Sequence, residues 1–242
     1  MGECLNLWRG FGVTAAPGDW SLLRKHILEV MAGGNQEYHA YIIRWMAWAV
    51  QNPDKPAGVT PVFKGGEGTG KETLARAMVK LFGLHGLQIL SQQHFTGKFN
   101  AQLHQCCLLF ADEAFYAGDK KSEGVLKGLI TEPTFLVERK TIDPVRVLNR
   151  LHVIMASNKE WVVPAAQDAR RFAVFEVAEE RAGDTKWFDL IYSSWRRTAA
   201  TRRCYTIYRP WSYITARATT FHRPRRSNFR SSCPTRGWNG GL

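Results

Sequence analysis

The sequence predicts an α/β fold, in which a largely parallel sheet is flanked by helices and preceded by a small helical segment. Three observations support this fold class. Short apolar runs alternate with helical stretches from residue 59 onward, a glycine-rich loop joins the first run to a helix, and a breaker-rich segment at 52–58 separates these runs from the N-terminus. Strands that alternate with helices are typical of a parallel sheet covered on both faces.

The N-terminal segment, residues 1–57, is expected to contain two helices. The first begins near Asp19, which can cap it, carries apolar residues at helical spacing and ends at Gly33 and Gly34. The second spans about 35–50 and has a broad apolar face. The segment NPDKPAG, 52–58, contains two prolines and is expected to be a linker.

The core, residues 58–191, is expected to hold the sheet. Its predicted strands are short and apolar: Val59–Lys64, Leu87–Leu90, Cys106–Ala111, Thr134–Val137, Arg146–Leu148, Leu151–Ala156 and Phe172–Val177. The predicted helices cover Glu72–Phe82 and Lys121–Ile130.

Length and composition limit the class of protein. The 242 residues are enough for one domain with small additions. The sequence has neither a run of 18 apolar residues nor a signal peptide, so we expect a cytoplasmic protein with no membrane span. The five cysteines are scattered and form no C-x-x-C pair, which argues against a zinc site or a disulfide framework.

The basic charge is concentrated at the C-terminus. The net charge is +12, but residues 192–242 contain eleven arginines and no acidic residue, so the rest of the chain carries only about +1. Beyond about Trp195 the sequence has neither helical nor strand periodicity. We therefore expect 192–242 to be an irregular basic tail, and the global charge is weak evidence for a nucleic-acid partner.

The segment VTPVFKGGEGTGKET, residues 59–73, carries the strongest functional signal. It matches the P-loop or Walker A pattern G-x-x-x-x-G-K, with a strand before it and a helix-forming run after it. Glycines let successive N–H groups turn toward phosphates, the helix N-terminus adds a positive dipole end, and the lysine reaches the β- and γ-phosphates. The pattern predicts an ATP site formed by Gly65, Gly66, Glu67, Gly68, Thr69, Gly70, Lys71, Glu72 and Thr73.

One position departs from this pattern. The residue after the lysine is usually Ser or Thr and binds Mg²⁺, but here it is Glu72, followed by Thr73. Thr73 can take part in Mg²⁺ binding through water, and Asp112, at the end of a later strand, is the other expected ligand. The Glu72 carboxylate can also repel the phosphates.

Two later strands end in polar residues. The strand in QCCLLFADEA, 105–114, ends in two carboxylates about forty residues after the Walker A motif, as a Walker B strand does. Asp112 would hold Mg²⁺, and Glu113 would polarise the water that attacks the γ-phosphate. The strand in LHVIMASN, 151–158, ends in Asn158, which would lie between the two motifs and orient that water or the γ-phosphate. The alternative for Asn158 is a simple turn residue.

Two basic clusters complete the candidate site. Arg170 and Arg171 come just before the strand in RRFAVFEV, from where an arginine can reach the γ-phosphate of a neighbouring subunit. A hairpin is expected between 130 and 150, with Arg139 and Lys140 near its tip, where they can contact a nucleic-acid backbone. For both clusters the alternative is a solvated basic loop.

The motifs GGEGTGK, FADEA, VERK, IMASN and ARRF, in that order, resemble those of superfamily 3 helicases, and most of all the helicase domain of phage and prophage primase-polymerases. The resemblance runs from about Leu5 to about Ile191. It implies an AAA+-like core that hydrolyses ATP with Mg²⁺ at the subunit interfaces of a hexameric ring and translocates on single-stranded DNA during phage replication. It also implies a primase or polymerase domain, expected on another chain or lost.

By position, the resemblance assigns a role to each candidate. Lys71 would bind phosphate, Asp112 and Glu113 would form the Walker B pair, and Asn158 would be the sensor. Arg170 or Arg171 would be the arginine finger, and Lys140, beside Arg139, would lie on the DNA-contacting hairpin.

The resemblance ends where the composition changes. Instead of the amphipathic helix expected after WFDLIYSS, the sequence continues RRTAATRRCYTIYRPW. We interpret residues from about 195 onward as an out-of-frame or fused segment, with a real basic tail that binds phosphates non-specifically as the alternative.

The favoured function is an ATP-dependent DNA helicase or translocase module. One alternative is a small-molecule phosphotransferase, because adenylate kinases also lack Ser or Thr directly after the P-loop lysine. The other is an inactive prophage remnant, which the unusual tail keeps open.

Overall fold

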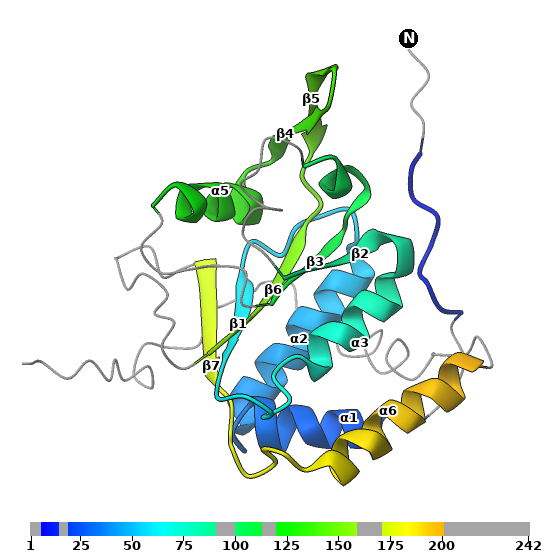
Figure 1. Ribbon diagram of the computed structural model, residues 1–242, viewed down its shortest axis with the longest axis vertical. Helices are drawn as coiled ribbons and strands as arrows, with labels where there is room; N and C mark the ends of the chain where they lie inside the picture. The colour runs from blue at the N-terminus through cyan, green and yellow to red at the C-terminus, as the bar shows by residue number, and fades with distance from the viewer. Residues whose placement is uncertain (1–5, 15–18, 91–99, 113–119, 159–170, 201–242) are drawn as a thin grey trace, which may run out of the picture.

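The computed structural model describes residues 6–14, 19–90, 100–112, 120–158 and 171–200, and for 120–123 and 196–200 it describes the backbone alone (Figure 1). A parallel sheet of five strands forms its centre. The strand order is β2 (Gly86–Ile89), β3 (Leu108–Asp112), β6 (His152–Ser157), β1 (Thr60–Lys64) and β7 (Phe172–Glu176). Every neighbouring pair is parallel, which confirms the predicted α/β class.

Alternate residues of the central strands face two separate parts of the core. Phe63, Phe110 and Ile154 pack in one cluster with α2 (Gln36–Gln51) and α3 (Thr73–Phe82). Val62, Leu109 and Val153, one position earlier on the same strands, pack in a second cluster with α5 (Lys120–Thr131). Successive strand side chains point to opposite faces, so both faces are apolar and both are covered.

The register of the strands aligns their carboxyl ends. Lys64, at the end of β1, lies opposite Ser157 of β6 and Glu176 of β7. Asp112, at the end of β3, lies opposite Ala156 of β6. The carboxyl ends of β3, β6, β1 and β7 therefore form one edge of the sheet, and β6 lies between the strands that carry the two predicted motifs.

The first N-terminal helix differs from its prediction. Asp19 accepts hydrogen bonds from the N–H and hydroxyl of Ser21, as expected near a helix start, and the helix α1 spans Ser21–His26. It then continues as a π-helix, η1 (Ile27–Met31), in place of one uninterrupted α-helix. The Ala32 N–H donates to the Ile27 carbonyl at 2.9 Å, a bond five residues back that the apolar spacing does not reveal.

The second N-terminal helix follows its prediction closely. The Asn35 side chain accepts from the N–H groups of Glu37 and Tyr38 at 2.8 and 3.1 Å and caps α2. The helix ends at Gln51, where the predicted linker begins.

The predicted hairpin is present as a separate two-stranded sheet at the top of Figure 1. Its antiparallel strands, β4 (Thr134–Arg139) and β5 (Ile142–Leu148), are longer than predicted and leave Lys140 and Thr141 at the turn. Thr141 adopts a φ of 60° there. Pro144 cannot donate a ladder hydrogen bond, and it is accommodated because β5 is an edge strand.

The last described helix extends farther than predicted. Helix α6 spans Thr185–Ala200, so regular structure continues five residues beyond Trp195, across the predicted core boundary at 191. It packs against α1 at the bottom of Figure 1. Residues 201–242, including most of the segment interpreted as out of frame, lie outside the described part of the chain. None of the described helices is long and apolar enough to cross a bilayer.

Candidate functional site

The glycine loop, residues 65–71, connects the end of β1 to the start of α3 in the predicted strand–loop–helix order. Its first N–H, on Gly65, donates to the Ser157 carbonyl at 3.1 Å and fixes the loop to the end of β6. Gly68 and Gly70 have φ values of 69° and 82°. Glycine adopts this left-handed backbone at low cost, which is why both positions need it.

The loop lysine folds back across the loop. Lys71 is only 4% exposed, and its Nζ donates to the Gly66 carbonyl at 3.3 Å and to Asn158 Oδ1 at 3.1 Å. Asn158 directly follows β6. Two residues predicted from separate motifs are therefore in direct contact.

Asp112 lies one strand beyond Asn158 on the same edge of the sheet. It ends β3, is 8% exposed, and accepts a hydrogen bond from Gln88 Nε2 of β2 at 3.2 Å. Its opposite residue on β6, Ala156, is two positions before Asn158. Gln88 was not predicted as a site residue, because a single glutamine in a short strand has no functional pattern. Glu113 lies outside the described residues.

The two residues after the lysine have different surroundings. The Glu72 carboxylate pairs with Arg76 one turn later on the surface of α3. Thr73 is fully buried, and its Oγ1 has no hydrogen-bond partner among the residues that the structure describes. A buried hydroxyl without a partner is costly, and a cation or an ordered water would satisfy it.

Together these groups lie at the carboxyl ends of β1, β6 and β3. A buried lysine, a glycine loop at a helix start and a carboxylate on a nearby strand end can hold an oxyanion and a hard cation. Within the described ranges no three His, Cys, Asp or Glu side chains gather closely enough to bind a metal by themselves.

The other predicted residues lie away from this edge. Arg171 precedes β7 and donates from Nε to Thr131 Oγ1 of α5 at 3.3 Å, at the amino ends of the strands. Arg139 contacts His104 Nδ1 at 3.0 Å, and Lys140 is exposed at the hairpin turn. The structure thus does not bring the described basic residues together with the glycine loop of the same chain, and Arg170 lies outside the described residues.

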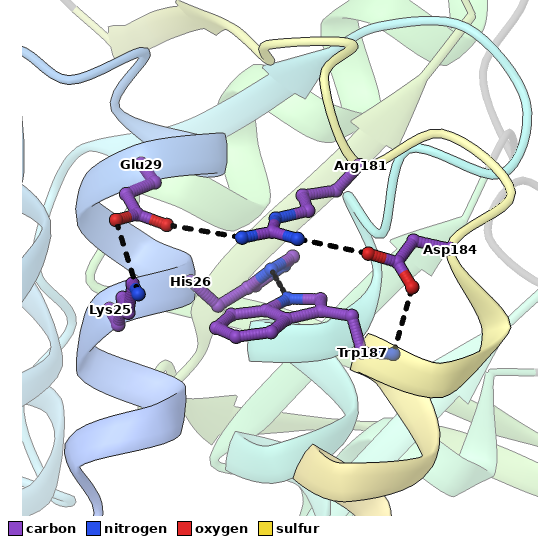
Figure 2. Close-up of polar contacts among 6 residues, drawn as sticks. All are labelled: Lys25, His26, Glu29, Arg181, Asp184 and Trp187. Atoms are coloured by element: carbon purple, nitrogen blue, oxygen red, sulfur yellow. Dashed lines mark hydrogen bonds and ion pairs between the residues drawn. The ribbon is translucent and has the colours of Figure 1, made fainter.

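The sequence did not predict the residues that contact Gly70; one of them, His26, is shown with its partner Trp187 in Figure 2. His26 of α1 is fully buried, its Nε2 lies 3.1 Å from the Gly70 carbonyl, and its Nδ1 accepts from Trp187 Nε1 of α6 at 3.2 Å. Burial is the main cause that lowers the His26 pKa. The apolar spacing around His26 indicates that it is buried, but it does not reveal a partner 44 residues away.

A cavity of about 660 Å³ lies at the opposite edge of the sheet. Its lining includes Trp8, Asp54, His85 and Arg150, residues that precede or flank the amino ends of strands. It shares no lining residue with the glycine loop and is therefore not part of the candidate site.

Comparison with known proteins gives a family match over the middle of the chain. Residues 63–171 match a family described as a family of unknown function, DUF5906. Over 138 residues, the chain is 30% identical to the "DNA Primase-polymerase" of Nitratiruptor phage NrS-1. That alignment covers 55% of this chain but only 19% of the relative.

Solved structures of the NrS-1 C-terminal region have a similar fold. The A form apo structure has a TM-score of 0.66 at 22% identity, covering 81% of this chain and 47% of that one. A second apo structure, of residues 305–718 of that protein, has a TM-score of 0.65 at 20% identity, and the match covers 84% of this chain and 49% of that one. The chain thus spans about half of these structures. The chain is related to a phage DNA primase-polymerase, and its fold is similar to that of about half of the relative's C-terminal region.

Proposed function

We propose that this chain is the ATP-hydrolysing module of a phage or prophage replication protein and acts as a DNA helicase or translocase. The observation that carries the proposal is the contact between Lys71 Nζ and Asn158 Oδ1 at 3.1 Å, beside the strand that ends in Asp112. A hydrolase needs a phosphate-binding cation, a metal carboxylate and a water-orienting amide at one place, and these three residue types share one edge of the sheet.

The contacts of Lys71 suggest how ATP would enter. Two of the acceptors that its ammonium group contacts are neutral oxygens, those of Gly66 and Asn158. The β- and γ-phosphates carry full negative charges and would displace these weaker acceptors. The Asn158 amide would then be free to orient the attacking water, which couples phosphate binding to assembly of the hydrolytic site.

The residues present fit Mg²⁺. The buried hydroxyl of Thr73, which has no partner within the described part of the chain, and the buried carboxylate of Asp112 are oxygen ligands of the kind that Mg²⁺ prefers. Bound there with ATP, the ion would neutralise charge that develops on the phosphates. The Glu72 carboxylate, which pairs with Arg76, does not need to approach the phosphates. Glu113 remains the proposed base.

Substitution of the loop lysine tests the nucleotide site. Lys71→Ala should lower ATPase kcat/KM by about 10²-fold or more, because the charge that stabilises the transferring phosphate is removed. Lys80→Ala, which removes an exposed lysine on the helix α3 that follows the loop, is the matched control and should behave as wild type. Both are measured on the full chain with and without single-stranded DNA. Unchanged turnover of Lys71→Ala would refute the assignment of the loop.

Substitution of Glu113 separates binding from hydrolysis. Glu113→Gln should still bind ATP but hydrolyse it about 10²- to 10⁴-fold more slowly, because the amide cannot accept the proton of the attacking water. The measurements are equilibrium binding of a fluorescent ATP analogue and steady-state phosphate release. Full hydrolytic activity in this variant would assign the base elsewhere.

Phosphate transfer to a nucleoside monophosphate by the wild-type protein, in place of DNA-stimulated hydrolysis, would instead identify a phosphotransferase.

A further inference from the structure

Two carbonyls of the glycine loop are held by groups outside the sheet. The Gly68 carbonyl accepts from the Gly183 N–H at 3.2 Å, and the Gly70 carbonyl accepts from Thr73 N–H at 3.0 Å and lies 3.1 Å from His26 Nε2. A trans peptide is planar, so its N–H points away from its own C=O. Because these two carbonyls are held, the N–H groups of the next residues, Thr69 and Lys71, point away from the groups that bind the carbonyls.

The tautomer of His26 follows from its neighbours. The indole Nε1 of Trp187 can only donate, so the His26 Nδ1 that lies 3.2 Å from it must accept. Since burial lowers the pKa of His26, the ring is neutral near pH 7 and carries its single proton on Nε2. That proton is donated to the Gly70 carbonyl.

Trp187 is itself fixed by charged groups (Figure 2). The Arg181 guanidinium lies 4.5 Å from the centroid of the Trp187 ring and pairs with Asp184 at 3.0 Å and with Glu29 of η1 at 3.9 Å. Asp184 also accepts from the Trp187 backbone N–H at 3.0 Å. The indole therefore presents its donor to His26 in one orientation.

The space around Gly70 is filled by the same two helices. A Cβ on Gly70 would lie 2.4 Å from Phe188 Cε1 of α6 and 2.8 Å from His26 Cε1 of α1. These distances are shorter than any normal contact, so the loop backbone touches both rings directly. The loop conformation thus depends on residues near both ends of the described chain.

We infer that His26 is a positioning residue of the nucleotide site, whose Nε2–H orients the Gly70 peptide so that the Lys71 N–H faces the bound phosphate. Trp187 acts through His26, because its indole N–H sets the tautomer of the imidazole ring. This inference rests on the proposed ATP site. It assigns part of nucleotide affinity to α1 and α6, both of which lie outside the residues 63–171 that match the family.

The test compares two substitutions of His26 in the full chain. His26→Leu removes the donor and the acceptor, and it should weaken binding of a fluorescent ATP analogue by about tenfold, the effect of one hydrogen bond at the upper end of its usual range. His26→Gln supplies an amide N–H for Gly70 and a carbonyl for Trp187, and it should recover most of that affinity. His39→Leu, another buried histidine on the neighbouring helix α2, is the matched control and should bind as wild type.

Each outcome decides the question. Wild-type affinity in a folded His26→Leu protein would overturn the inference, and so would equal losses in the Leu and Gln variants, since packing alone would then explain the effect. If His26→Leu fails to fold, Trp187→Phe replaces it. In that variant the ¹⁵N shifts of His26 should move toward the Nδ1–H tautomer and affinity should fall, whereas an unchanged tautomer or affinity would overturn the inference.

Failure of the proposed function is recognised separately. If Lys71→Ala binds the analogue as well as wild type, the nucleotide site itself is wrong. If Lys71→Ala loses binding while His26→Leu retains it, only the role of His26 is wrong.

Discussion

At the residue scale, the molecule buries several polar side chains whose partners decide what they can do. Lys71 is buried, and its ammonium group donates to the Gly66 carbonyl and to Asn158 Oδ1. His152, at the start of β6, is fully buried, and its Nδ1 lies 3.0 Å from the Cys107 carbonyl. Burying a charge costs far more than burying a hydrogen-bonded neutral ring. The folded state therefore tolerates His152 only in its neutral form.

The pH dependence of stability tests this. Burial lowers the His152 pKa from 6.5 to about 4. Between these values the unfolded chain binds a proton that the folded chain does not, so stability should fall as pH decreases from about 6.5 to about 4, by an amount on the order of 3 kcal/mol for this group. Burial lowers the pKa values of His26 and His39 in the same direction.

Urea unfolding at pH 7.5, 6 and 5 measures the effect. His152→Asn keeps an N–H for the Cys107 carbonyl but cannot titrate, so its stability should vary less with pH than that of wild type. Equal pH slopes in the two proteins would show that His152 is not the group responsible.

At the scale of elements, the β4–β5 hairpin stands apart from the main sheet and exposes both charged and apolar side chains. Lys140 lies at its turn, and Leu136, Ile142, Val145 and Leu148 are 49%, 54%, 55% and 61% exposed. The hairpin begins beyond the amino ends of the strands, whereas the glycine loop lies at their carboxyl ends. A DNA contact here would be separate from the nucleotide site of the same chain.

Salt dependence of DNA binding tests the hairpin. Lys140→Ala should weaken single-stranded DNA binding to any sequence and reduce the slope of log K against log salt by about 0.7, the value for one lost phosphate contact. Lys186→Ala, an exposed lysine on α6, makes the same charge change elsewhere and should leave the slope as it is. Equal effects of the two variants would indicate that only net charge matters.

At the scale of the whole molecule, the candidate site is divided between two edges of the sheet. The glycine loop, Asn158 and Asp112 lie at the carboxyl edge, and Arg171 lies at the amino edge. β7, with five residues at about 3.3 Å each, spans roughly 16 Å between them. At this separation Arg171 does not reach the glycine loop of its own chain, so the proposed finger role would require a neighbouring subunit.

Mixing inactive proteins tests action between subunits. Arg171→Ala and Lys71→Ala should each lose ATPase activity alone, but a mixture should regain part of it, because some interfaces then pair an intact loop with an intact arginine. Arg170→Ala is examined in the same way. Thr131→Val removes the hydroxyl that Arg171 contacts within its own chain and should retain activity. A mixture as inactive as its components would exclude a finger in trans.

The sequence by itself determined the strand–loop–helix order around Lys71, the strand that ends in Asp112, the hairpin with Lys140 at its turn and the class of the sheet. These features have local signatures: apolar periodicity, glycine spacing and strand-ending polar residues. The π-helix at 27–31 had no such local signature, because one extra residue in a helical turn barely changes the apolar spacing. The extension of α6 to Ala200 had none either, because a segment with weak periodicity can still form a helix when it packs against another helix, here α1.

Only the tertiary structure decided which residues meet. Lys71 contacts Asn158, His26 contacts Gly70 and Trp187 contacts His26 across 87, 44 and 161 residues of chain. Such contacts depend on strand order and on how helices pack, and a buried histidine or tryptophan looks the same in sequence whether its partner is a core residue or a phosphate-binding loop. The sequence therefore predicted the strand–loop–helix order around the glycine loop, while the packing of α1 and α6 against Gly70 emerged only from the assembled fold.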